Sequence, residues 1–429
     1  MLYEHWLRTA LERPAEIALR EGASGRQWTF GELADAGGKR ESVAGKVAYP
    51  RGISAEFVIH VLQAWRDRRI VCPLEPGQAA PVVEPPPEGI VHLKTTSATN
   101  GRSRLVAFTA EQLAADAENI VATMGLRQDW PNLGVISLAH SYGFSNLILP
   151  LLLHGVPLIL ADSPLPESVR RAAAAEGELT LAAVPALWRA WLDAEAIPPN
   201  VRLAISAGAP LPVPLEEEAF VRRGLKIHNF YGSSECGGIA FDASTGPRQD
   251  GTCAGAPLHG VQCAMGSEGC LEVRSSAVGQ TYWPQPAEQL QDGIFRTSDL
   301  AELSGGLVYL RGRSGDQINV AGRKVSPETI ERVLLAHPAV RECVVFGTPS
   351  ADVERSEKIV ACVALKTETP AEELKKWLLA ELPAWQVPRD WRIVDSLAAS
   401  ARGKLSRTEW RERLFPSPGG QMPPGLRNR

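Results

Sequence analysis

The sequence predicts an α/β protein with a large N-terminal domain of mixed, largely parallel sheets, which carries a β-rich subdomain, and a small α+β C-terminal domain. The chain has 429 residues, more than a single hydrophobic core usually holds. Between residues 134 and 240, short apolar runs alternate with segments of helix length, as in buried parallel sheets. Residues 252–310 are rich in glycine, valine and leucine and poor in helix signals, which indicates a β-rich unit.

The first elements can be placed individually. Residues 1–20 are expected to form a helix, and Thr29 is positioned to cap a second one through its hydroxyl. Apolar strands are expected at 90–93 and 105–108, on either side of a loop of hydroxyl residues and glycine at 95–104. Further strands of the parallel sheet are predicted at residues 134–138, 157–160, 180–184 and 201–205.

The boundary between the two domains is predicted after residue 312, so that residues 1–312 form the first domain and residues 313–415 the second. In the second domain, Ser326 and Pro327 begin a helix, because serine caps helices and proline is tolerated at the first helical position. Residues 416–429 are rich in proline and glycine and are expected to be disordered.

Composition and charge exclude several classes of partner. The net charge is −4, so the chain lacks the basic excess of nucleic-acid-binding proteins, and no nucleic-acid partner is expected. The seven cysteines contain no C-x-x-C pair, which favours reduced thiols. The N-terminus lacks the pattern of a signal peptide, and Pro150 and Pro157 interrupt the one long apolar stretch. We therefore expect a cytoplasmic protein without a membrane span.

Two motifs suggest phosphate and metal binding. The loop at 95–104 offers backbone N–H groups and hydroxyls to an anion, although it lacks the G-x-x-x-x-G-K-[ST] pattern of a P-loop. Residues 229–235 follow the apolar strands directly, so that Tyr231 can stack on a base and Glu235 can bind Mg²⁺. Each motif also has an ordinary structural interpretation, as a polar loop and as a turn with a solvated carboxylate.

Two further residues stand out. Asp299, in the segment 295–299, can accept hydrogen bonds from two ribose hydroxyls, because a carboxylate has two oxygens; alone, it could equally cap a turn. Lys404 follows a loop of small residues and, taken alone, would be an ordinary solvated charge.

Together, the order and spacing of these motifs resemble the AMP-forming superfamily of acyl-CoA synthetases, stand-alone adenylation domains and luciferases. The resemblance covers nearly the whole chain and is closest to a shortened acyl-CoA synthetase-like ligase. The matching segments are 97–104 for S-G-S-T-G-x-P-K, 205–210 for G-G-A-x-L, 231–235 for Y-G-x-T/S-E, 296–299 for R-T-G-D, 312–322 for G-R-x-D-D-x-I-K-x-x-G, 325–331 for V-S-P-x-E-I-E, 382–388 for L-P-x-Y-M-V-P, and Lys404 for the family's catalytic lysine.

The resemblance implies that a small carboxylic acid is activated with ATP and Mg²⁺ as its acyl-AMP, with release of pyrophosphate, and that the acyl group then passes to a thiol. It also implies a mobile C-terminal domain, with a hinge at Gly315 and Lys404 reaching the reacting groups. Thr99 and Glu235 join Lys404 as catalytic residues, and Glu235 is also the Mg²⁺ ligand. The contacts to ATP or AMP are expected at Ser97, Asn100, Gly101, Arg104, Gly208, Ala209, Asn229, Tyr231, Gly232, Ser234, Asp299 and Arg313, and the acyl pocket at His140 and Gly208.

The sequence also departs from the family pattern. Ser103 and Arg104 replace a proline and a lysine, Gly315 replaces the hinge aspartate, and the stretch before the phosphate loop is short. The acyl acceptor is CoA or, alternatively, a phosphopantetheine on a carrier protein. A non-catalytic nucleotide-binding relative is a third hypothesis, which the retained lysine and carboxylates disfavour.

Overall fold

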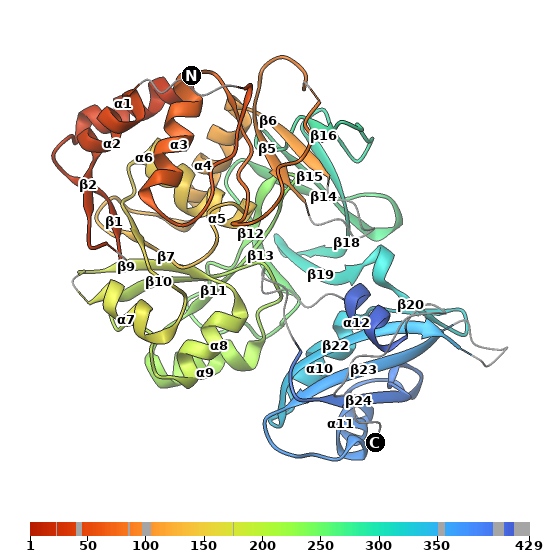
Figure 1. The fold of residues 1–429 in the computed structure, drawn as a ribbon. Coiled ribbons are helices and arrows are strands. Elements are labelled where there is room, and N and C mark those ends of the chain that lie inside the picture. Colours follow the sequence, from red (N-terminus) through yellow and green to blue (C-terminus); the bar gives the residue numbers. More distant parts are fainter. Residues whose placement is uncertain are drawn as a thin grey trace.

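The computed structural model describes residues 1–22, 24–39, 45–84, 86–96, 104–174, 176–350, 357–397 and 407–415. Figure 1 shows a large unit, coloured red to cyan, and a smaller unit in blue that ends the chain. The predicted disordered tail, 416–429, lies outside the described residues.

The largest sheet has 14 strands and joins a mainly parallel half to an antiparallel half. One half contains β1 (Ile17–Glu21), β2 (Gln27–Thr29), β7 (Asn132–Gly134), β8 (Leu158–Leu160), β9 (Leu179–Ala183), β10 (Val201–Ser206) and β11 (Ile227–Ser233). The other contains β12 (Gly237–Phe241), β13 (Cys253–Pro257), β14 (Val261–Met265), β15 (Cys270–Ser275), β17 (Leu290–Gln291), β18 (Ile294–Ser304) and β19 (Leu307–Arg313). The strands in the order β11-β10-β9-β7-β8-β1 are all paired in parallel, and β11 then pairs antiparallel with β12. The change of direction at β11 places the candidate motif at 229–235 where the two halves meet.

A second sheet of five strands flanks the phosphate loop. Its strands are β3 (Val47–Ala48), β4 (Ile70–Val71), β5 (Ile90–Thr95), β6 (Leu105–Thr109) and β16 (Thr281–Trp283), in the order β16-β6-β5-β4-β3. β5 and β6 pair antiparallel, and β16 pairs antiparallel with β6. Residues from distant parts of the sequence therefore meet beside the loop that joins β5 to β6.

Helices cover both sides of the parallel strands. In Figure 1, one group lies above these strands and α7 to α9 lie below them. The helical segments of the large unit are α1 (Leu2–Glu12), α2 (Phe30–Gly38), α3 (Ala55–Arg66), α4 (Ala110–Met124), α5 (Ser141–Gly143), the π-helix η1 (Phe144–Ile148), α6 (Leu149–His154), α7 (Pro166–Ala173), α8 (Pro185–Asp193), α9 (Val213–Arg223) and the short 3₁₀-helix η2 (Ser267–Gly269). Thr29 caps α2 as predicted, in a reciprocal pair with Glu32. The α/β core is thus built from strands buried between helices.

The C-terminal unit has its own apolar cores. It contains η3 (Ser314–Asp316), β20 (Ile318–Val320), β21 (Arg323–Val325), α10 (Pro327–Leu335), β22 (Val340–Pro349), β23 (Glu357–Leu365), α11 (Ala371–Glu381), η4 (Ala384–Gln386), β24 (Asp390–Val394) and α12 (Arg407–Leu414). As predicted, α10 begins at Pro327 with Ser326 in the N-cap position, but the Ser326 hydroxyl donates to Glu328 and makes no capping hydrogen bond to the backbone. The predicted domain boundary after residue 312 falls near the end of β19 and stays a prediction.

The predicted α/β class is confirmed, but two predicted elements were wrong in extent. The helix expected over residues 1–20 ends at Glu12, and residues 17–21 form β1 instead. Arg13 leaves the helical conformation because a following proline, Pro14, disfavours it. The strand expected at 134–138 stops at Gly134. Among the helices in the described ranges, none is long and apolar enough to cross a membrane.

Candidate active site

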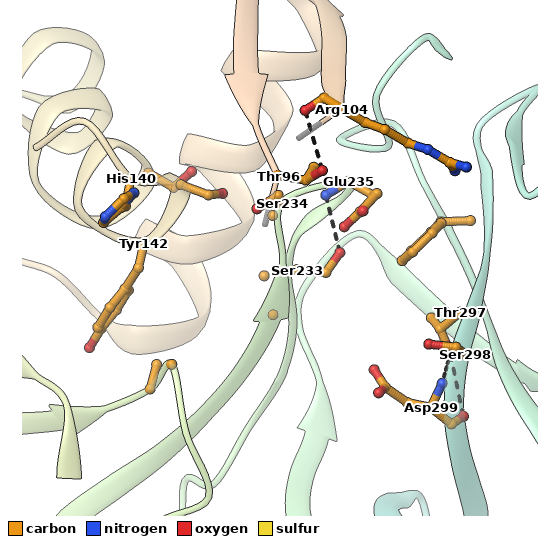
Figure 2. Close-up of a pocket in the computed structure, with 18 of the residues that line it drawn as sticks. Thr96, Arg104, His140, Tyr142, Ser233, Ser234, Glu235, Thr297, Ser298 and Asp299 are labelled. Carbon is orange, nitrogen blue, oxygen red and sulfur yellow. Dashed lines mark hydrogen bonds between the residues drawn. The ribbon is translucent and has the colours of Figure 1, made fainter. Parts of the chain in front are cut away.

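A cavity of about 1860 Å³ opens where the two halves of the large sheet meet the second sheet. Figure 2 shows three groups of its side chains: His140 and Tyr142 on one side, Thr297, Ser298 and Asp299 on the other, and Ser233, Ser234 and Glu235 between them. The predicted site residues that line this cavity are Arg104, His140, Gly208, Gly232, Ser234, Glu235, Asp299 and Arg313. The strand ends therefore bring together eight of the residues predicted from dispersed motifs.

Asp299 lies at one end of the cavity, where two donors hold its carboxylate. The hydroxyl of Tyr231 donates to Oδ2 at 2.5 Å, and Nε of Arg313 donates to Oδ1 at 2.9 Å. Asp299 and Arg313 are direct partners in the β18–β19 pair. Burial, and then the charge of Asp299, raise the pKa of Tyr231, so its phenol stays a proton donor. Each carboxylate oxygen keeps a lone pair for a further hydrogen bond.

Glu235 lies between the two ends of the cavity. Its backbone N–H donates to Oγ of Ser233 at 3.2 Å, which fixes the turn between β11 and β12. The hydroxyl of Tyr282 donates to its Oε1 at 3.1 Å. Within the described residues no cluster of three metal-ligating side chains occurs. A single carboxylate beside a phosphate site fits Mg²⁺, which is commonly held by one or two carboxylates together with substrate phosphates.

The phosphate loop is described only at its two ends. Thr96 donates to the carbonyl oxygen of Arg104 from its N–H at 2.9 Å and from its hydroxyl at 3.3 Å, which closes the base of the loop. The guanidinium carbon of Arg104 lies 5.4 Å from the ring centroid of Tyr282. The predicted residues Ser97, Thr99, Asn100 and Gly101 lie outside the described residues.

Three of the predicted ATP or AMP contacts, Gly208, Ala209 and Asn229, are only partly at the cavity. Gly208 lines it and has a φ of +86°, a conformation that favours glycine. Ala209 and Asn229 are not among the lining residues. Asn229 is buried on β11 opposite Ser206 of β10, and its backbone carbonyl accepts a hydrogen bond from Asp242. Their predicted contacts to ATP or AMP stay predictions.

His140 stands at the opposite end of the cavity from Asp299 and has an acidic partner that the sequence did not reveal. Its Nε2 lies 2.9 Å from Oε1 of Glu75, which also accepts a hydrogen bond from the hydroxyl of Ser137. Glu75 belongs to the proline-rich segment before β5, 65 positions away in the sequence. Such a distant partner left no local signal.

A buried ion pair supports the floor of the cavity. Lys94 and Asp116 are almost fully buried, with Nζ 3.5 Å from Oδ2. The hydroxyl of Ser145 donates to the same Oδ2 at 2.6 Å and accepts from Lys94 at 3.2 Å. Asp116 also accepts the N–H of Gly238 at 3.2 Å, which tethers the segment just after Glu235. This pair was not predicted, although a lysine inside the apolar strand β5 requires a buried partner.

At the start of the C-terminal unit, Gly315 lies in η3, and a Cβ built on it meets no atom within 4 Å. The neighbouring Asp316 pairs with Arg407 at the start of α12, with Oδ2 2.9 Å from Nη1. Arg407 also binds Glu328 at 2.7 Å and Glu331 at 2.6 Å, both on α10. Lys404, the predicted catalytic lysine, lies outside the described residues.

Comparison with protein families gives two matches that follow one another along the chain. The family described as "AMP-binding enzyme" matches residues 38–283, and the "AMP-binding enzyme C-terminal domain" matches residues 329–404. Among curated proteins, the mitochondrial malonate–CoA ligase of Mus musculus is 28% identical over 384 residues, which are 77% of this chain and 65% of that protein. The feruloyl-CoA synthase of an Amycolatopsis species is 28% identical over 344 residues, 75% of this chain and 69% of that protein. The chain thus spans about two thirds of the length of these relatives.

Solved structures share the fold over almost the whole chain. The O-succinylbenzoate coenzyme A synthetase of Bacillus subtilis, in complex with AMP, superposes with a TM-score of 0.80 at 21% identity and covers 94% of this chain and 97% of that one. An anthranilate CoA ligase in complex with anthranoyl-AMP gives a TM-score of 0.82 at 20% identity and covers 96% of both chains. At these identities the likeness shows a common fold, and it confirms the predicted architecture.

Proposed function

The chain belongs to the AMP-binding enzyme family, and on that basis we propose that it uses ATP to convert a carboxylic acid to its acyl-AMP and then transfers the acyl group to the thiol of CoA. Two curated relatives are named as CoA ligases, one for malonate and one as a feruloyl-CoA synthase, and this supports CoA as the acceptor. The chain matches only about two thirds of the length of these relatives. Their activity is therefore a proposal for this chain.

The observation that carries the proposal is the arrangement of two carboxylates in one cavity. Asp299 is held by Tyr231 and Arg313 with lone pairs to spare, which suits a pair of ribose hydroxyls. Glu235 lies between this site and His140, where the phosphates and the acid would meet. A ribose site and an acid pocket on either side of a metal carboxylate are what adenylate formation requires.

The proposed first step is the attack of a substrate carboxylate oxygen on the α-phosphorus, with the pyrophosphate oxygen leaving. Such a transfer needs mainly positioning and charge stabilisation, because the protein forms no covalent bond. Arg104 provides positive charge at the end of the phosphate loop, and Lys404 would provide it at the reacting carboxylate. Mg²⁺, when bound at Glu235, would neutralise phosphate charge. In the second step a thiolate attacks the acyl carbon, and AMP leaves.

We propose the hinge, the pyrophosphate contacts and the cellular location from the sequence. Gly315 would be the hinge between the two steps, and the phosphate contacts of Ser97, Thr99, Asn100 and Gly101 would hold the leaving pyrophosphate. The cytoplasmic location is likewise proposed from the sequence; one curated relative is named as mitochondrial.

The test is pyrophosphate release by the purified chain with ATP, Mg²⁺ and a panel of aliphatic, aromatic and dicarboxylic acids. We expect release with at least one class of acid, and acyl transfer to CoA rather than to a carrier protein. Lys404→Ala should lower the rate of adenylate formation by about 10²–10³-fold, as expected for the loss of one charge stabiliser, while AMP binding is retained. AMP binding without pyrophosphate release from any acid would instead identify a non-catalytic relative.

A further inference from the structure

Tyr282 is a cavity residue that no motif identified. It lies on β16, 47 positions after Glu235 in the sequence, and its side chain is 7% exposed. Its hydroxyl donates to Oε1 of Glu235 at 3.1 Å. Within the described residues no partner is recorded for Oε2 of Glu235, so one oxygen is held while the other remains available to a cation.

Pairing between strands fixes the position of this tyrosine. Tyr282 is the direct partner of Val106 on β6, the strand that leaves the phosphate loop. Arg104 lies two residues before Val106 and reaches over the Tyr282 ring, with its guanidinium carbon 5.4 Å from the ring centroid. Arg104, immediately before β6, and Tyr282, paired with β6, are therefore both positioned by that strand.

The phenol O–H faces an oxygen of the Glu235 carboxylate, and an ionised carboxylate can only accept. A hydrogen bond to an ionised carboxylate is stronger than one between neutral groups, so it restricts the rotation of Glu235. A ligand that is already oriented loses less entropy when it binds a cation.

We infer that Tyr282 is a positioning residue that orients the Glu235 carboxylate for the magnesium complex of ATP. The inference rests on the proposed function, because Glu235 is assigned as the metal ligand there. Tyr282 itself touches neither the metal nor the reacting atoms in this scheme. It acts through the one carboxylate oxygen that it holds.

The experiment is calorimetric binding of ATP with Mg²⁺, and separately of AMP without metal, to wild type and to Tyr282→Phe. The change keeps the ring, its packing on Val106 and its contact with Arg104, so the variant should fold, and a thermal melt verifies this. We expect the affinity for ATP with Mg²⁺ to fall by about three- to tenfold, the range for one hydrogen bond to a charged group that is partly replaced by water. The affinity for AMP should stay within about twofold of wild type.

Tyr309→Phe is the matched control. Tyr309 also has an arginine near its ring, with the guanidinium carbon of Arg311 5.7 Å from the centroid, but its hydroxyl has no recorded partner among the described residues. It lies outside the cavity lining, so both affinities should be unchanged. In a Glu235→Gln background, Tyr282→Phe should cause no further loss of metal-dependent binding, because the oriented carboxylate is already gone.

Three results would overturn the inference: an unchanged affinity for ATP with Mg²⁺, an equal loss for AMP, or full additivity with Glu235→Gln. Binding of ATP with Mg²⁺ by Glu235→Gln at wild-type affinity would also overturn it, since Glu235 would then not be the metal ligand. These binding measurements do not depend on catalysis. The failure of the proposed function would appear separately, as an absence of pyrophosphate release from wild type with every acid.

Discussion

The hydroxyl of Tyr231 lies 2.5 Å from Oδ2 of Asp299, so the tyrosine of one motif orients the aspartate of another motif that is 68 positions away. Tyr231 is not among the lining residues of the cavity, and the base-stacking role that the sequence suggested for it stays a prediction. Tyr231 lies on β11, four positions before Glu235, and Asp299 lies on β18 in the antiparallel half of the sheet. This contact ties the two halves of the sheet together at the proposed ribose site.

Loss of the hydrogen bond between Tyr231 and Asp299 should lower the affinity for every ligand that contains adenosine by a similar factor. We expect Tyr231→Phe to lower the affinities for ATP and AMP by a similar factor, about three- to tenfold, and Asp299→Ala to lower both by about tenfold or more. The two affinities should fall together because both ligands carry the ribose. Calorimetry with each ligand measures this, with Tyr309→Phe as the control. A loss confined to the magnesium complex of ATP would show that Tyr231 does not act through the ribose site.

Lys94 and Asp116, the ion pair beneath the cavity, should depend on each other for stability, so that replacing one of them lowers the free energy of unfolding more than replacing both. Lys94→Met leaves Asp116 buried without its counter-charge and should lower the free energy of unfolding by about 3–5 kcal/mol. In Lys94→Met/Asp116→Asn the charge is gone, while the amide oxygen can still accept from the N–H of Gly238. The double variant should therefore recover most of the loss. Urea unfolding of the single and double variants measures this, and purely additive losses would contradict the coupling.

Features that depend on residues close together in the sequence were predicted, whereas contacts between residues far apart in the sequence were not. The cap of α2 at Thr29 and the start of α10 at Ser326 are local features, and both were predicted; the reciprocal bond from Glu32 was not. Asp299 was found because it stands in a motif with a fixed order. Its contact with Tyr231 could not be found, because no local pattern records which strand lies opposite which.

Tyr282 and Glu75 were not predicted, because their partners lie far away in the sequence. Tyr282 on the five-stranded sheet reaches Glu235 in the turn between β11 and β12 of the large sheet, and Glu75 reaches His140 from the proline-rich segment before β5. Neither residue type is unusual in its own stretch of sequence. Lys94 is different, since a charge within an apolar strand requires a buried partner, and that requirement could have been stated before the partner was known.

Arg407 should stabilise the C-terminal unit in a pH-dependent way. It binds Asp316, Glu328 and Glu331, and of these three Glu331 is the least exposed, with 15% of its side chain accessible. Burial, only partly offset by Arg407, raises the pKa of Glu331 above its usual value. Arg407→Gln removes the counter-charge and should lower the free energy of unfolding at neutral pH by about 3–5 kcal/mol.

The sign of the pH effect follows from the raised pKa. A carboxyl whose pKa is higher in the folded state contributes stability at low pH, and that contribution is lost as the pH rises through the folded value. Loss of Arg407 raises the folded pKa of Glu331 further, so the destabilisation should shrink as the pH falls from about 8 to about 5. Calorimetric unfolding at several pH values measures it. Arg411→Gln, an exposed change on the same helix, should show neither effect; a loss for Arg407→Gln that is independent of pH would contradict the argument.

Gly315 is the proposed hinge between the two domains. Gly315 is not among the glycines with positive φ, and a Cβ on it meets nothing within 4 Å, so alanine fits in the present conformation. Gly312 differs, since its φ is +111° and a Cβ there would lie 2.0 Å from Oγ of Ser326. Gly315→Ala is thus a clean control for a backbone change, whereas Gly312→Ala would disturb the packing of β19 against the start of α10.

Gly315→Pro should separate the two half-reactions, because proline fixes φ near about −65° and removes one N–H. If the fixed angle suits the adenylating arrangement, pyrophosphate release in the first turnover is preserved and transfer to the thiol slows; if it suits the other arrangement, the pattern inverts. Gly315→Ala should leave both rates close to wild type, since alanine still permits a wide range of backbone angles. Single-turnover pyrophosphate release and thiolysis of preformed acyl-AMP measure the two steps independently. Equal loss in both steps, or no loss in either, for a folded Gly315→Pro protein would mean that the chain does not turn at this residue, and the hinge would have to lie elsewhere between β19 and α10.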